Sequence, residues 1–92
     1  MSDMQGEYIV IINKSVMKVL RKLPTNLLRR ISQVIDDLSK DPRPVGCKKL
    51  EGYDNLYRIR VGDWRISYAV EDARLIILVI EVAPRGGAYR SL

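Results

Sequence analysis

The residues of this chain that are best suited to chemistry are arginines in the stretch Tyr57–Tyr68. Near its middle, Gly62-Asp63 is a favoured two-residue connection between antiparallel strands, with glycine where the backbone needs a positive φ. The hairpin that this turn predicts pairs Arg60 with Arg65, and because side chains alternate across a strand, it has two distinct faces. The apolar face contains Tyr57, Ile59, Val61, Trp64, Ile66 and Tyr68, and the cationic face contains Arg58, Arg60 and Arg65.

The cationic face predicts a site for an anion. Like charges that face each other across a sheet cost a few tenths to about 1 kcal/mol, and a small domain has little stability to lose. Planar guanidinium groups donate paired hydrogen bonds that match phosphate. For any one of these arginines a solvated surface position is an equal alternative. We favour phosphate because three of them share one face.

The composition predicts a single basic domain over residues 1–92. Of the residues, 47% are hydrophobic and 29% charged, which is typical of globular proteins. Sixteen Lys and Arg against eleven Asp and Glu give a net charge of +5, which favours an anionic partner such as nucleic acid or an acidic protein segment. One cysteine, Cys47, and no histidine lead us to expect no disulfide, no metal and no cofactor. We expect a cytoplasmic protein with no signal peptide and no membrane association.

The first half of the chain predicts a strand followed by two helices. Glu7–Ile12 is apolar and β-branched, which indicates a buried strand. We expect Asn13 to cap a short helix, and Thr25, after the break at Pro24, to cap a second helix that runs through about Ser39. The two helices should form an antiparallel pair.

The second half of the chain changes to the period of two that is typical of strands. Lys48–Leu50 predicts a short strand or the approach to one, and Leu56–Val61 and Trp64–Glu71 are the strands of the hairpin. Leu75–Val82 is almost continuously apolar, which predicts a central strand covered on both faces. We therefore expect an α+β fold: an N-terminal strand, an antiparallel helix pair, and a mainly antiparallel sheet of three or four strands. The helices should cover the apolar face and leave the arginine face open.

Over nearly its whole length the chain resembles the RelE/ParE superfamily, the toxic half of bacterial and archaeal toxin–antitoxin pairs. An arginine-bearing strand followed by Gly-Asp, an aromatic residue and arginine is a specific combination. The segments that carry the resemblance are Leu38-Ser39-Lys40-Asp41-Pro42, Lys48-Lys49-Leu50-Glu51-Gly52, the hairpin Tyr57–Tyr68, and Val82-Ala83-Pro84-Arg85 with Tyr89-Arg90 behind it.

Similarity to RelE-type members implies a RelE-like microbial ribonuclease-type fold and a metal-independent endoribonuclease. Such an enzyme enters the ribosomal 30S A site and cuts messenger RNA by attack of the 2′-hydroxyl on the adjacent phosphate, which inhibits translation. The resemblance also implies an acidic RelB-like antitoxin as partner in a hetero-oligomer. This chemistry depends mostly on positioning and electrostatic stabilisation.

The resemblance also implies roles for individual residues. Arg58 and Arg60 would activate the 2′-hydroxyl and hold charge, and Arg65 would stabilise the phosphate. Arg85 would protonate the leaving oxygen, and Tyr89 would stack on or orient a base. The residues implied in RNA binding are Lys48, Lys49 and Arg90.

The general base is left open by the sequence. Arg58 and Arg60 stand where some members have lysines, and arginine is effectively never neutral. Tyr89, Lys48 and Lys49 are the alternatives. Tyr89 is as well suited to packing against the sheet as to stacking on a base.

The function also has alternatives. A ParE-type member would inhibit DNA gyrase and have no nuclease activity, and a third alternative is a non-toxic domain that binds nucleic acid on the same scaffold. An arginine at position 85 followed by Tyr89 favours the ribonuclease.

Overall fold

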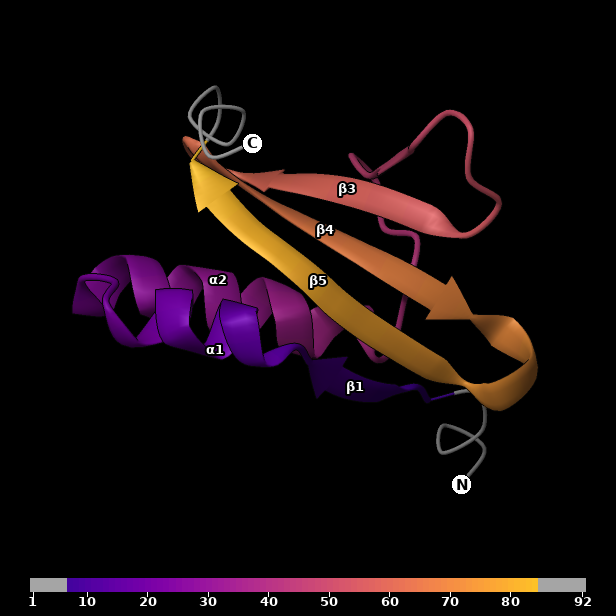
Figure 1. Cartoon of the computed structure of the whole chain (residues 1–92), viewed down its shortest axis with the longest axis horizontal. Coiled ribbons are helices and arrows are strands. Elements are labelled where there is room, and N and C mark those ends of the chain that lie inside the picture. Colours follow the sequence, from indigo (N-terminus) through magenta and orange to yellow (C-terminus); the bar gives the residue numbers. More distant parts are fainter. Residues whose placement is uncertain (1–6, 85–92) are drawn as a thin grey trace.

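A computed structural model describes residues 7–84 as a twisted five-stranded sheet with two helices on one face (Figure 1). The strands lie in the order β1-β5-β4-β3-β2, with β1 parallel to β5 and all other neighbours antiparallel. This confirms the predicted α+β class and element order. The elements are β1 (Ile9–Ile12), α1 (Lys14–Arg21), α2 (Thr25–Leu38), β2 (Lys48–Lys49), β3 (Leu56–Val61), β4 (Trp64–Glu71), the 3₁₀ turn η2 (Asp72–Arg74) and β5 (Ile76–Pro84).

The two helices begin in different ways. Asn13 caps α1 as predicted, because its side-chain oxygen accepts a hydrogen bond of 3.0 Å from the Ser15 backbone N–H. Thr25 does not cap α2: it is already helical, and Pro24 occupies the cap position with an extended backbone (φ −59°, ψ 150°). The proline has the dihedral angles that the start of a helix needs, so the prediction for Thr25 is wrong by one residue. Neither helix in the described part of the chain has the length and apolar character needed to cross a membrane.

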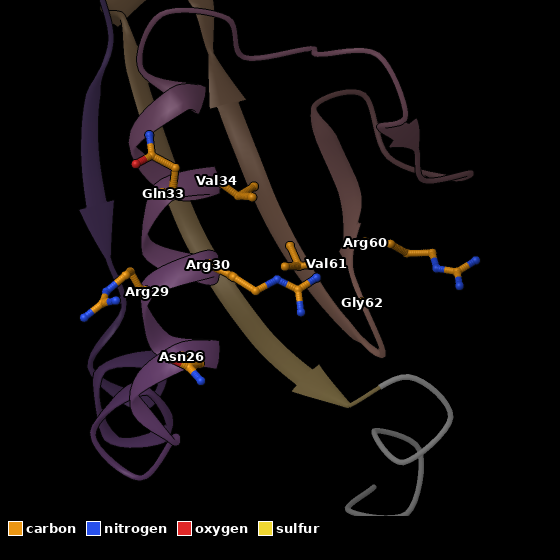
Figure 2. A pocket seen from close by; sticks show the side chains of 8 residues that line it. All are labelled: Asn26, Arg29, Arg30, Gln33, Val34, Arg60, Val61 and Gly62. Atoms are coloured by element: carbon orange, nitrogen blue, oxygen red, sulfur yellow. The ribbon is translucent and has the colours of Figure 1, made fainter.

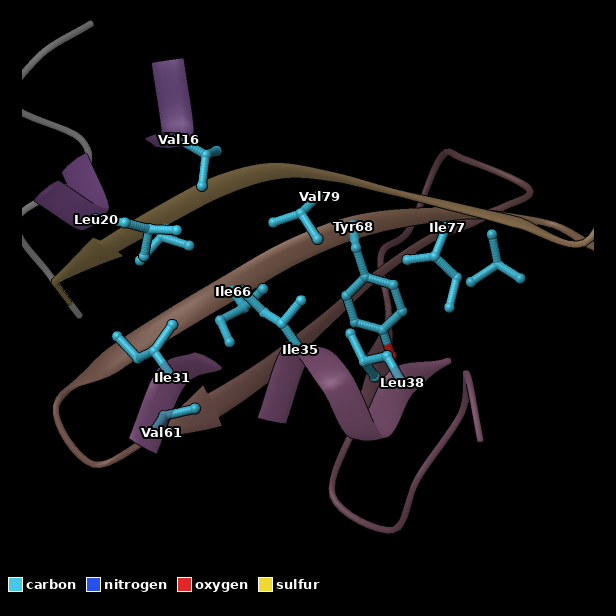
Figure 3. Close-up of a cluster of buried hydrophobic side chains, with 12 residues drawn as sticks. Val16, Leu20, Ile31, Ile35, Leu38, Val61, Ile66, Tyr68, Ile77 and Val79 are labelled. Atoms are coloured by element: carbon cyan, nitrogen blue, oxygen red, sulfur yellow. The ribbon is translucent and has the colours of Figure 1, made fainter. Parts of the chain in front are cut away.

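The core lies between α2, α1 and the apolar face of the sheet (Figure 3). Ile31 and Leu38 of α2 meet Ile66 and Tyr68 of β4, and all four side chains are 0% exposed. Burying a side chain of this size contributes roughly 1.5–3 kcal/mol. The side chains of the hairpin that the sequence assigns to the apolar face are therefore held inward by a large hydrophobic free energy.

Two predictions about strand burial are wrong. Residues 7–12 do not form a buried strand, because β1 is an edge strand and leaves Ile9 65% and Ile11 46% exposed. The strand from residue 75 is also not the central one, which is β4. In β5, Ile77 and Val79 are fully buried on the face that the helices cover. The opposite face of β5 is only half-buried, because α1 and α2 both lie on the helix side of the sheet.

The end of the sheet away from the Gly62 turn is held by Arg43, from the loop after α2. Its guanidinium donates to Asp72 Oδ2 at 2.6 Å and to the Tyr57 hydroxyl at 3.0 Å. The Tyr8 hydroxyl donates to the other carboxylate oxygen of Asp72 at 2.6 Å. The hydrogen bond from Arg43, and then that from Tyr8, lower the pKa of Asp72.

This network predicts a pH-dependent contribution to stability. Because the pKa of Asp72 is lower in the folded state than its usual value near 3.9, its contribution is fully present above that value and is lost as the pH falls through the folded pKa. Asp72→Asn should therefore melt below wild type at neutral pH, and the difference should vanish in acid. Thermal unfolding at a series of pH values measures this, with Asp54→Asn in an exposed loop as the control. A difference in melting temperature between Asp72→Asn and wild type that is independent of pH would contradict this role of the Asp72 carboxylate.

Candidate active site on the helix-free face of the sheet

The predicted hairpin is present with its predicted register. Gly62 has a positive φ of 60° at the turn, Arg60 lies opposite Arg65, and Arg58 lies opposite Ser67. Residues opposite each other on antiparallel strands share a face. The three arginines therefore lie on one face of the sheet, and that face is the one the helices leave uncovered. We call it the cationic face.

The three arginines differ in exposure. Arg60 is exposed and Arg58 is half-buried, whereas Arg65 is only 6% exposed. The expectation of an open face is therefore correct at Arg60 and wrong at Arg65, which lies on the central strand with a neighbouring strand on each side. A buried guanidinium has already lost side-chain entropy on folding, so it is positioned before an anion arrives.

The Nε atom of the Arg58 side chain also indicates a site for an anion. Arg58 Nε is buried and has no hydrogen-bond partner among residues 7–84. A buried donor that lacks an acceptor costs roughly 1–3 kcal/mol. An anion on this face would supply such an acceptor.

The register separates the two lysines of β2. Lys48 lies opposite Arg58 and belongs to the cationic face, whereas Lys49 lies opposite Tyr57 and belongs to the other face. The two lysines therefore do not approach one site together, and their roles in binding RNA stay predictions. Three further candidates, Arg85, Tyr89 and Arg90, lie outside the described residues.

The sequence analysis missed a carboxylate on the cationic face. Glu81 of β5 lies opposite Ser67, and the Ser67 hydroxyl donates to Glu81 Oε1 at 3.0 Å. Ser67 in turn lies opposite Arg58, which lies opposite Lys48. One row of side chains therefore crosses four strands, from a lysine through an arginine and a serine to a glutamate.

A β-bulge puts Glu81 in this row. Tyr68 pairs with Val79, but the next residue back, Ser67, pairs with Glu81, so the register shifts by one. An unbroken ladder would turn Glu81 toward the helices and Val82 away from them. Instead, Val82 is 4% exposed in the core. The sequence signal for this bulge was a charged residue, Glu81, at a position that strict alternation of side chains along the strand would turn toward the core.

A groove lies on the opposite side of the hairpin tip, between α2 and the end of β3 (Figure 2). Arg30 of α2 extends toward Gly62, whereas the side chain of Arg60 points away from the other labelled residues. The groove therefore lies mainly on the helix side of the sheet and shares Arg60 with the cationic face. Its lining residues are Asn26, Arg29, Arg30, Gln33, Val34, Arg60, Val61 and Gly62.

Comparisons with known proteins agree with this fold. A family model described as the ParE toxin of the type II toxin–antitoxin system parDE matches residues 10–89. A putative toxin RelE1 of Methanocaldococcus jannaschii is 34% identical over 88 residues, which cover 92% of this chain and 98% of that protein. The chain belongs to the RelE/ParE family of type II toxins.

Further relatives of this RelE/ParE toxin support the assignment. The toxin RelE of Mycobacterium tuberculosis is 29% identical over 91 residues, covering 98% of this chain and 93% of that protein. The crystal structure of an archaeal RelE–RelB complex from Pyrococcus horikoshii OT3 matches with a TM-score of 0.79 and 38% identity, covering 87% of this chain and 97% of that chain. The predicted RelE-like fold is therefore confirmed.

Proposed function

We propose that this RelE/ParE toxin is a ribosome-dependent endoribonuclease that cuts messenger RNA. The observation that carries the proposal is the presence of Arg58, Arg60 and Arg65 on one uncovered face of the sheet, in a chain whose relatives are named RelE toxins. Guanidinium groups match the geometry and charge of the phosphates in an RNA backbone. The net charge of +5 favours approach to the ribosome and its message.

The proposed reaction needs positioning more than it needs a reactive group. The 2′-hydroxyl attacks the adjacent phosphorus, the bond to the 5′-oxygen breaks, and negative charge accumulates on the phosphate oxygens in the transition state. Arg65, which is buried and preorganised, would stabilise that negative charge, while Arg58 and Arg60 would hold the RNA backbone in line for attack. The resemblance assigns protonation of the leaving oxygen to Arg85 and base stacking to Tyr89.

We also propose an acidic antitoxin of the RelB type as partner. RelE chains form complexes with RelB in the structures from Pyrococcus horikoshii and Methanococcus jannaschii. In this chain, the exposed edge strand β1 offers unpaired backbone groups to an added strand. An acidic segment that also covered the cationic face would neutralise the toxin by occlusion.

The ParE description of the matching family model favours a second candidate, inhibition of DNA gyrase. In that case the cationic face would bind a protein or DNA and would cut nothing. The two candidates differ in what they do to messenger RNA and to DNA supercoiling.

Purified protein added to a translating extract separates the candidates. We expect cuts in messenger RNA that is bound to ribosomes, none in naked RNA, and no effect on supercoiling by gyrase. Arg60→Ala should retain the wild-type melting temperature because Arg60 is exposed, and it should slow cleavage roughly 10²–10³-fold by removing a charged donor from the phosphate.

The matched control is Arg74→Ala, because Arg74 is 71% exposed at the other end of the sheet. It carries the same loss of charge and should cleave like wild type. Lost supercoiling without cuts would reject the ribonuclease in favour of the gyrase inhibitor. Equal losses of cleavage in Arg60→Ala and Arg74→Ala would show that net charge, not the cationic face, is responsible.

The antitoxin proposal predicts a rescue. Expression of the toxin should arrest growth, and co-expression of the adjacent small open reading frame should restore growth and yield a stable complex. A complex that forms while toxicity persists would contradict neutralisation by occlusion.

A further inference from the structure

We propose that Glu81 is the general base of the cleavage reaction, taking the proton from the attacking 2′-hydroxyl. This inference rests on the proposed ribonuclease function. It names a residue for the role of general base, which the permanently charged arginines of the cationic face do not fill.

The first argument is location. Glu81 ends the row that runs across the sheet through Arg58 and Ser67. Strands in a sheet lie about 4.8 Å apart, so the backbones of Glu81 and Arg58 are about 10 Å from each other. Both side chains are long enough to reach one phosphodiester group bound between them. A nucleotide held by Arg58 and Arg65 would therefore have the carboxylate within reach of its ribose.

The second argument is chemical. A general base must accept a proton, but a charged guanidinium or ammonium group has no acceptor site. A carboxylate has about four acceptor sites, and the hydrogen bond from Ser67 to Oε1 occupies one of them. Because side chains alternate along β4, Glu71 is a second carboxylate on the cationic face. It lies at the far end of the strand beside Arg74, away from Arg58 and Arg65.

The third argument is orientation. Ser67 is 4% exposed, and its hydroxyl donates to Glu81 from the neighbouring strand at 3.0 Å. A buried hydroxyl has few alternative partners, so it restricts the rotamers of the half-buried carboxylate. Ser67 is thus a positioning residue for Glu81. The bulge that places Glu81 opposite Ser67 disrupts the ladder locally, and bulges often re-aim a side chain next to an active site.

In the proposed step, the proton of the 2′-hydroxyl moves to Glu81 as the bond between the 2′-oxygen and phosphorus forms. The bond between phosphorus and the 5′-oxygen breaks, and the leaving oxygen takes up a proton that comes ultimately from solvent. The products are a 2′,3′-cyclic phosphate and a 5′-hydroxyl. Glu81 then returns its proton to solvent, so that the enzyme is restored.

The alternative role for Glu81 is to offset the charge of the arginines. The cationic groups on its face of the sheet are Arg65 on the neighbouring strand β4, Arg58 and Arg60 on β3, and Lys48 on β2. If Glu81 only balanced these charges, Glu81→Gln would bind message more tightly and would cleave it at least as fast as wild type. A general base predicts a loss of cleavage rate without a loss of binding.

The test measures single-turnover cleavage of ribosome-bound message, together with binding to the programmed ribosome and thermal unfolding. Glu81→Gln should slow cleavage roughly 10²–10⁴-fold, bind at least as tightly as wild type, and melt like wild type. Ser67→Ala should slow cleavage roughly tenfold through the lost hydrogen bond. Glu71→Gln, which makes the same charge change on the same face, is the control and should match wild type.

Each other outcome overturns a specific statement. Glu81→Gln with the wild-type rate would overturn the role of Glu81 and leave the ribonuclease intact. Wild-type protein that cuts nothing would overturn the ribonuclease, and the role of Glu81 with it. If Glu81→Gln fails to fold, Glu81→Asp decides, because a carboxylate displaced by about 1 Å should slow cleavage by at least roughly tenfold. A wild-type cleavage rate in Glu81→Asp would overturn the role.

Discussion

The burial of Ile66 and Tyr68 beneath α2 is the constraint on which the site depends. Both side chains are 0% exposed, and the Tyr68 hydroxyl donates to the Pro42 carbonyl at 2.7 Å, which satisfies its one buried polar group. Burial raises the pKa of Tyr68, so the hydroxyl remains a donor. Because side chains of a strand alternate, holding these two inward directs Arg65 and Ser67 to the uncovered face. A shift of one residue would turn the arginine toward the helices and expose the core.

The bulge in the β4–β5 ladder gives the cationic face its acid. It leaves Val82 in the core and turns Glu81 outward, so one irregularity satisfies both packing and polarity. The face therefore combines donors for a phosphate with an acceptor for a proton. Arg43 and Asp72 hold the opposite end of the sheet, so the structural ion pair and the candidate site are at different places in the fold.

Short-range signals in the sequence predicted much of this structure. The turn at Gly62-Asp63 and the period of two determined the register of Arg60 with Arg65, and Asn13 marked the start of the first helix. Long-range pairing was not predictable in the same way. Nothing local says that residues 9–12 pair only with β5, and β1 is therefore an exposed edge although it is as apolar as a buried strand.

The same distinction holds for the site. Strand parity gave the face of the arginines, but the burial of Arg65 depends on the strands at its sides, and the separation of Lys48 from Lys49 depends on how β2 pairs. The outward direction of the Glu81 side chain depends on the bulge.

Cross-strand nuclear Overhauser contacts in the folded toxin test the direction of Glu81 most directly: the account predicts backbone contacts of Ser67 with Glu81 and of Ile66 with Val82. A contact of Ile66 with Glu81 in place of Val82 would contradict it, because the carboxylate would then face the helices.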